Sequence, residues 1–145
     1  MRMVRESKEL LLDTHVWIWL VNGERKIQGG TLDKLIRDKR FSLDVRVSAM
    51  SVWEVGMLEI KGRIELPFDC LEWIRRALGA PGVSLAPVTA EIAVASSRLP
   101  GEFHGDPVDR ILVATAQYLG ATLVTQDSQI LAYSKEHRLP AIAAF

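Results

Sequence analysis

The chain has 145 residues, of which 48% are hydrophobic and 25% are charged. This length and balance are typical of a globular domain that can bury a core. The 18 basic and 18 acidic residues cancel, so net charge predicts no nucleic-acid partner, and any such site must be a local patch. Cys70 is the only cysteine, which excludes an intramolecular disulfide and a cysteine-rich metal site.

Strand-like and helix-like segments alternate along the chain. Residues 1–9 are charged, and we expect them to be a flexible lead-in to a single domain that spans residues 1–145. In chain order, we then expect a strand at 10–12, helices at 16–21 and 31–39, a strand at 41–47, helices at 51–61 and 68–78, a strand at 83–88, helices at 89–98 and 107–119, a strand at 121–125, a helix at 128–137 and a short strand at 140–145.

Two of these helices have clear start signals. Ser51 and Glu54 match a capping box, with Ser51 as the N-cap. Asp106 before Pro107 matches an N-cap followed by proline in the first turn, and Gly120 matches the C-terminal end of the same helix. The alternation predicts an α/β fold, a three-layer αβα sandwich with a central, mostly parallel sheet.

No apolar run is long enough to span a bilayer. The N-terminus also lacks the long apolar segment and small-residue cleavage site of a secretory signal. We therefore expect a cytoplasmic protein without membrane contact.

Four carboxylates lie near the ends of predicted elements. Asp13 directly follows the first strand, Glu54 follows the second within two helical turns, Asp127 follows the strand at 121–125, and Asp109 lies in the first turn of the helix before that strand. Ligands of open α/β sheets bind outside the carboxyl ends of the strands. We therefore expect these acids to converge at that edge.

Helix capping offers an alternative explanation for three of these acids. Glu54 completes the Ser51 capping box, Asp109 occupies the third position of its helix, and Asp127 precedes a helix. Asp13 has no such explanation, since it ends an apolar strand where an unpaired carboxylate is costly. Clustered carboxylates repel one another, and a hard cation such as Mg²⁺ or Mn²⁺ would relieve the repulsion. Such an ion can activate water for phosphodiester hydrolysis.

Four segments of the chain resemble the PIN-domain ribonucleases, and most closely the VapC-type toxins of bacterial toxin–antitoxin pairs. The segments are LLLDTH at 10–15, VSAMSVWE at 47–54, HGDPVDRILVA at 104–114 and LVTQD at 123–127. The resemblance implies the PIN-like αβα fold and a Mg²⁺- or Mn²⁺-dependent endoribonuclease that acts on structured RNA such as tRNA or rRNA. It also implies a cognate antitoxin partner near the first two helices, and a homodimer.

The resemblance also implies roles for individual residues. The catalytic acids and metal ligands are Asp13, Glu54, Asp109 and Asp127, with Asp106 as a secondary ligand, and Thr14 and Thr125 match supporting positions. Arg110 and His104 are further supporting candidates because they lie next to the acids in the sequence. The choice between Asp109 and Asp106 stays open, although the cap pattern favours Asp109 as the ligand. For Arg110, an ion pair with a nearby acid or a contact with RNA phosphate is expected.

Two other functions fit the same pattern less well. One is a non-catalytic RNA-binding or scaffold domain, which would be expected to have lost some of the acids. The other is a phosphoacceptor receiver domain, which would have paired acids after its first strand, whereas Thr14 follows Asp13 here.

Overall fold

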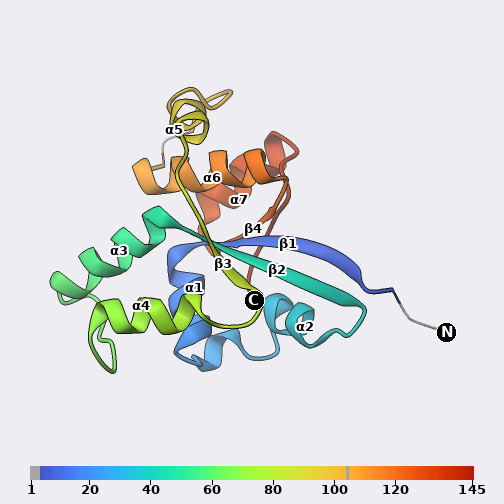
Figure 1. The fold of residues 1–145 in the computed structure, drawn as a ribbon. Helices are drawn as coiled ribbons and strands as arrows, with labels where there is room; N and C mark the ends of the chain where they lie inside the picture. The colour runs from blue at the N-terminus through green and yellow to red at the C-terminus, as the bar shows by residue number, and fades with distance from the viewer. Residues whose placement is uncertain (1–3, 104) are drawn as a thin grey trace.

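The computed structural model describes residues 4–103 and 105–145. Within these residues, five strands form one sheet in the order β3-β2-β1-β4-β5, and every neighbouring pair is parallel (Figure 1). In chain order the elements are β1 (Glu6–Leu12), α1 (Thr14–Val21), the 3-10 helix η1 (Arg25–Ile27), α2 (Thr31–Arg37), β2 (Phe41–Ser48), α3 (Ala49–Ile60), α4 (Cys70–Leu78), β3 (Val83–Ala86), α5 (Ala90–Ser97), α6 (Pro107–Leu119), β4 (Thr122–Val124), α7 (Ser128–Glu136) and β5 (Ala141–Ile142). The predicted fold class is confirmed.

Two hydrophobic cores lie on opposite faces of the sheet. Side chains alternate along a strand, and in β1 Leu10 and Leu12 pack with the helices from the first half of the chain. Leu11 instead packs with the helices from the second half, α5, α6 and α7. All three leucines are almost completely buried, as expected for a central strand covered on both sides.

The first strand begins at Glu6, so the prediction of a flexible lead-in was wrong for residues 6–9, while residues 1–3 lie outside the described part. Glu6 pairs with Phe41 in the parallel ladder. The ammonium of Lys8 lies 4.7 Å from the centroid of the Phe41 ring, and Glu9 forms an ion pair with Arg46 of β2 at 3.1 Å. Contacts with β2 therefore stabilise residues 6–9 as a strand, although their polarity alone suggested a loop.

The start of α3 also differs from the prediction. The helix begins at Ala49, and its N-cap is Ser48, whose hydroxyl accepts a hydrogen bond from the Met50 amide at 3.1 Å. Ser51 therefore lies inside the helix, where it is fully buried. The predicted capping box is wrong, and Glu54 lies in the second turn of α3 without a capping role.

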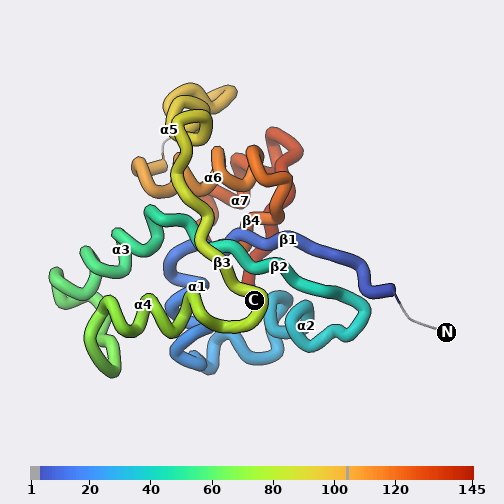
Figure 2. Tube along the Cα trace, in the orientation of Figure 1, coloured from blue at the N-terminus to red at the C-terminus, as the bar shows by residue number. Residues whose placement is uncertain are grey.

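The C-terminal end of the chain returns to the first half of the fold. Figure 2 shows it beside α2, and the Leu32 amide donates to the Ala144 carbonyl at 3.0 Å. This return brings Phe145 against the ring of Trp19 in α1, with 5.9 Å between centroids.

Candidate active site

The strand order changes direction between β1 and β4. From β1 the chain continues to β2 and β3 on one side, whereas β4 and β5 lie on the other. Neighbouring loops diverge at such a switch point and leave a crevice at the carboxyl edge of the sheet. Asp13 directly follows β1, and Asp127 comes three residues after β4. The expected meeting of these two acids at one edge is confirmed by the parallel register of Leu12 with Val124.

Asp13 is held from two directions. One carboxylate oxygen accepts the Thr14 amide at 2.7 Å, which makes Asp13 the N-cap of α1. The other accepts the buried Thr125 hydroxyl at 2.6 Å. The sequence had assigned no capping role to Asp13, because α1 was expected to start at residue 16 instead of Thr14. Its carboxylate is thus fixed in orientation between β1 and β4.

Glu54 reaches the same edge from α3. A hydrogen bond of 2.9 Å between the buried hydroxyls of Thr14 and Ser51 ties the start of α1 to α3. Since Ser51 and Glu54 lie three residues apart, both belong to the same side of the helix. The polar contact therefore sets the position of Glu54 relative to Asp13.

The two acids at the start of α6 have different tasks. Asp106 is exposed and accepts the Asp109 amide at 2.9 Å, so its predicted role as the N-cap is confirmed. Asp109 is half-buried and makes no cap. Both line the acidic crevice, so Asp106 contributes charge to it as well as capping the helix.

Asp127 caps α7, and its carboxylate accepts the amides of Gln129 and Ile130 at 2.8 and 3.0 Å. The capping alternative is therefore confirmed for this acid. The Thr125 hydroxyl accepts the Asp127 amide at 3.0 Å while it donates to Asp13. The buried Thr125 thus positions both Asp13, which follows β1, and Asp127, which follows β4.

The acids raise one another's pKa. Burial is the largest cause for Asp109, followed by the charges of Asp106, Asp13, Asp127 and Glu54, and together they raise the pKa of Asp109 to about 7. Burial also raises the pKa of Asp13, against the opposing effect of the Thr125 hydroxyl. The pKa of Glu54 is raised by burial and by the charge of Asp13. These mutual effects indicate that the carboxylates face a common space.

That space is a cleft of about 280 Å³. Its lining consists of the five acids Asp13, Glu54, Asp106, Asp109 and Asp127 together with His15, Val16, Trp19 and Gln126. Sequence reasoning missed Gln126, although its place between Thr125 and Asp127 was a usable signal. The Gln126 side-chain oxygen accepts the amides of Ala144 and Phe145 at 2.6 and 3.2 Å. It therefore anchors the C-terminal segment beside the acids.

Arg110 lies outside this cleft. Its guanidinium donates to the backbone oxygens of Ser96 and Phe103 at 2.9 and 2.7 Å. Arg110 thus fastens the segment between α5 and α6, and the predicted ion pair with an acid is replaced by these two carbonyl contacts. His104, the other proposed supporting residue, lies outside the described residues.

The donor set suits a hard divalent cation. The cleft offers carboxylate oxygens and no thiolate, which is the chemistry that Mg²⁺ and Mn²⁺ prefer. Within residues 4–103 and 105–145, no three acidic, histidine or cysteine side chains are close enough to coordinate an ion by themselves. Mg²⁺ requires only one or two carboxylates and completes its shell with water and substrate oxygens, so the residues present fit the ion.

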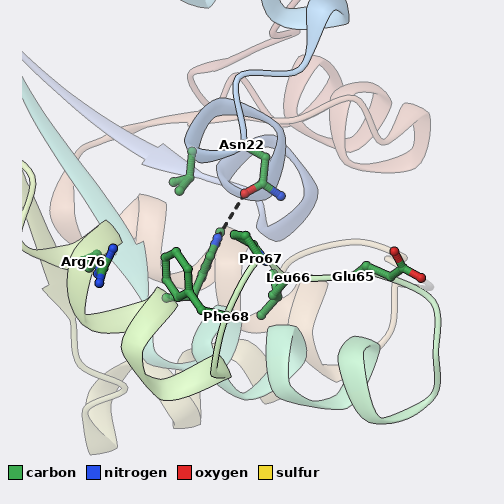
Figure 3. A pocket seen from close by; sticks show the side chains of 8 residues that line it. Asn22, Glu65, Leu66, Pro67, Phe68 and Arg76 are labelled. Atoms are coloured by element: carbon green, nitrogen blue, oxygen red, sulfur yellow. Dashed lines mark hydrogen bonds between the residues drawn. The ribbon is translucent and has the colours of Figure 1, made fainter.

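A separate pair of hollows lies on the face covered by α1, α2 and α4. The first, of about 580 Å³, lies between the end of α1 and the segment before α4 (Figure 3). There the Trp73 indole donates to the Asn22 side chain at 3.0 Å, and the Arg76 guanidinium lies over the Phe68 ring. The second, of about 660 Å³, adjoins it at Val21 and Arg76. No described residue of the acidic cleft lines either hollow.

No helix in the described part of the chain is both long and apolar enough to cross a membrane.

Comparison with known proteins identifies the family. A family model described as the PIN domain matches residues 10–136. Ribonuclease VapC22 of Mycobacterium tuberculosis is 30% identical over 131 residues, which cover 90% of this chain and 93% of that protein. A toxin–antitoxin complex from Klebsiella pneumoniae has a similar fold, with a TM-score of 0.64 at 20% identity and coverage of 94% of this chain and 98% of that one. VapBC2 from Rickettsia felis, solved with a DNA fragment from its promoter, has the same TM-score at 14% identity, with coverage of 93% and 98%. The family model spans most of the chain, the matched segments carry the acids of the cleft, and the chain therefore belongs to the PIN-domain family.

Proposed function

We propose that the protein is a Mg²⁺- or Mn²⁺-dependent endoribonuclease that hydrolyses RNA phosphodiester bonds and acts as the toxin of a cytoplasmic toxin–antitoxin pair. The observation that carries the proposal is the convergence of five acids from four separate parts of the chain on one cleft at the switch point of the sheet. The likeness to ribonuclease VapC22 supports the same activity.

The acids divide into ligands and a proton acceptor. Asp13 and Asp109 are the principal ligands in this proposal, and Asp127 and Asp106 complete the acidic shell. A bound divalent ion supplies Lewis-acid chemistry, by activating water and stabilising the oxygen that leaves phosphorus. Glu54, whose pKa is raised by burial, is suited to accept a proton from the attacking water, because a general base works best with a pKa nearer neutrality. Thr125 and Thr14 position these groups through their hydroxyls.

RNA needs cations near this acidic cleft. Among the basic residues, Arg37, Arg40 and Arg76 form ion pairs with neighbouring acids. Lys26 differs, because its ammonium lies 4.4 Å from the centroid of the Trp19 ring, and Trp19 lines the cleft. Lys26 therefore places a positive charge beside the cleft, and we propose that it contacts an RNA phosphate there. Structured RNA such as tRNA or rRNA remains the proposed substrate class.

The activity is tested on purified protein with total RNA, in Mg²⁺ or Mn²⁺ and in EDTA. We expect cleavage with metal, none in EDTA, and loss of cleavage in Asp13→Asn. Asp69→Asn is the matched control, because Asp69 caps α4 as Asp13 caps α1 but lies outside the cleft. Cleavage by Asp13→Asn at the parental rate would refute the mechanism. Absence of Mn²⁺ binding in calorimetry would favour the scaffold alternative.

An antitoxin is the proposed protein partner, and the adjoining hollows near α1 and α2 are its proposed site. The larger hollow has a mainly apolar lining that includes Trp17, Leu20 and Ile36, and Val21 and Ile36 leave over 40% of their side chains exposed. Co-expression with the product of the neighbouring reading frame tests this partner. Ile36→Asp should abolish co-purification, whereas Ile60→Asp, at an exposed residue outside the hollows, should not. A homodimer is also proposed, and light scattering measures it.

A further inference from the structure

A second groove opens directly from the acidic cleft. It has a volume of about 310 Å³ and runs between α3 and the start of α6. Glu54 and Asp106 line both the groove and the cleft. A chain that lies in the groove therefore passes next to two of the acids of the cleft.

The groove wall on α3 is one stripe of the helix. Met50, Trp53, Met57 and Lys61 all line the groove, and their spacing of three or four residues places them along one face. The side of α3 that is packed in the protein is marked by other residues, the buried Ser51 and Val55. Met50, at the start of the stripe, also packs partly against the core formed by α5, α6 and α7, whereas Trp53, Met57 and Lys61 belong to neither hydrophobic core.

Trp53 is the most unusual member of this stripe. Its side chain is 54% exposed, whereas those of Trp17 and Trp73 are only 1% and 2% exposed. Trp53 lies with Met50 and Met57 in the groove lining, beside the charged residues Glu54 and Lys61. It therefore belongs to an apolar surface rimmed by polar residues, which is the arrangement that marks a binding site. Next to a phosphodiester site, an exposed indole is a suitable platform for a nucleobase, because bases of every kind stack on aromatic rings.

Two cations lie at the far end of the groove. Lys61 follows α3 directly, and Gly62, with φ of +71°, turns the chain so that Arg63 lines the same groove. Both cations are exposed, and neither forms an ion pair with the described residues. The groove therefore joins an acidic end to a basic end through an apolar, aromatic middle.

We infer that this groove holds the RNA strand next to the scissile phosphate, with one base stacked on Trp53 and backbone phosphates held by Lys61 and Arg63. The inference rests on the proposed ribonuclease function and identifies where its substrate is bound. Charge complementarity favours RNA as the occupant. A polyanion satisfies the two cations at one end and presents a phosphate to the acidic cleft at the other.

RNA binding is measured apart from cleavage, in Asp13→Asn versions of each variant, with a short fluorescein-labelled RNA of mixed sequence. Fluorescence anisotropy should show that Trp53→Ala raises Kd about tenfold, as expected for the loss of one stacked base, while Trp53→Phe keeps most of the affinity. Lys61→Glu with Arg63→Glu should make the slope of log Kd against log salt shallower by about 1.4, since each lost phosphate contact on a single strand contributes about 0.7. Lys39→Glu with Lys135→Glu is the matched control, because both lysines are exposed and neither lines the groove.

The outcomes separate this inference from the proposed activity. If the parent cleaves RNA and the groove variants bind it with unchanged Kd and salt slope, the groove inference is overturned while the activity stands. If the parent fails to cleave but the variants lose binding as expected, the groove inference stands and the activity fails. If Trp53→Ala dissociates a dimer in light scattering and leaves RNA affinity unchanged, a second copy occupies the groove and the inference is overturned.

Discussion

Substitution of Asp109 by asparagine should stabilise the metal-free protein while it removes activity. The pKa of Asp109 is raised to about 7 by burial and by four neighbouring acids. A carboxyl group with a raised pKa keeps its proton in the folded state after the unfolded state has lost it. Folding stability therefore falls as pH rises from the unfolded pKa of 3.8 to the folded pKa of about 7. The amide side chain of the variant has no such proton to lose, so Asp109→Asn escapes this penalty.

The size of the effect follows from the shift. A rise of the pKa from 3.8 to about 7 corresponds, without solvent screening, to about 4 kcal/mol of folding free energy. Asp109 is only half-buried, and solvent screening reduces such effects, so we expect about 2 kcal/mol in total. Between about pH 5 and about pH 7.5, the parent should lose about 1 to 2 kcal/mol of unfolding free energy relative to Asp109→Asn.

Urea denaturation in EDTA at these two pH values measures the difference, and comparison with the variant cancels the titration of all other groups. Asp33→Asn is a control of opposite sign, because the Gly29 amide and Arg37 lower the pKa of Asp33, so its loss should weaken the fold near neutral pH. If Asp109→Asn were no more stable than the parent at the higher pH, the proposed effect of burial and of the neighbouring acids on Asp109 would be refuted.

Three further predictions test other parts of the site and fold. Thr125→Val should raise the pKa of Asp13 further and lower cleavage at least tenfold, since a hydrogen bond to a charged group contributes about 1.5 to 3 kcal/mol; a pH–rate profile with an unchanged acidic limb would argue against this role. Ser48→Ala should lower the unfolding free energy by about 1 kcal/mol because it removes the α3 cap, and an unchanged stability in urea would contradict the capping role of Ser48. Leu11→Ala should lower the unfolding free energy by about 2 to 5 kcal/mol in the same assay, because the Leu11 side chain of β1 is fully buried against α5, α6 and α7.

The layered fold and the acidic edge could be predicted from the sequence, because each depends on local patterns. The apolar run at residues 10–12 has no polar position that could face solvent, so a doubly covered strand was the consistent choice. Asp106, Pro107 and Gly120 mark their helix by backbone chemistry that acts within a few residues. Such local signals can be recognised in the sequence without knowledge of the tertiary structure.

The parts that were wrong or missed depend on distant partners. Glu6 to Glu9 become strand only because β2 lies beside them. The sequence around Ser51 resembles a helix cap, but in the fold Ser51 accepts a hydrogen bond from the Thr14 hydroxyl, 37 residues away in sequence. Gln126 gained its role from Ala144 and Phe145, which contact it only in the folded chain. Sequence periodicity carries no record of these pairings.

The hydrogen bond between Thr125 and Asp13 joins residues 112 positions apart. During synthesis the first strand can pair with β2 early, but the acids that follow β1 and β4 can meet only after the last strands have left the ribosome. An incomplete chain lacks both the hydroxyl that orients Asp13 and the carboxylate of Asp127, so the acidic cleft cannot form in it. Because β4 lies late in the chain, the cleft can form only near the end of synthesis. If the proposed activity is correct, chains that end before Thr122 should leave RNA intact in the same assay.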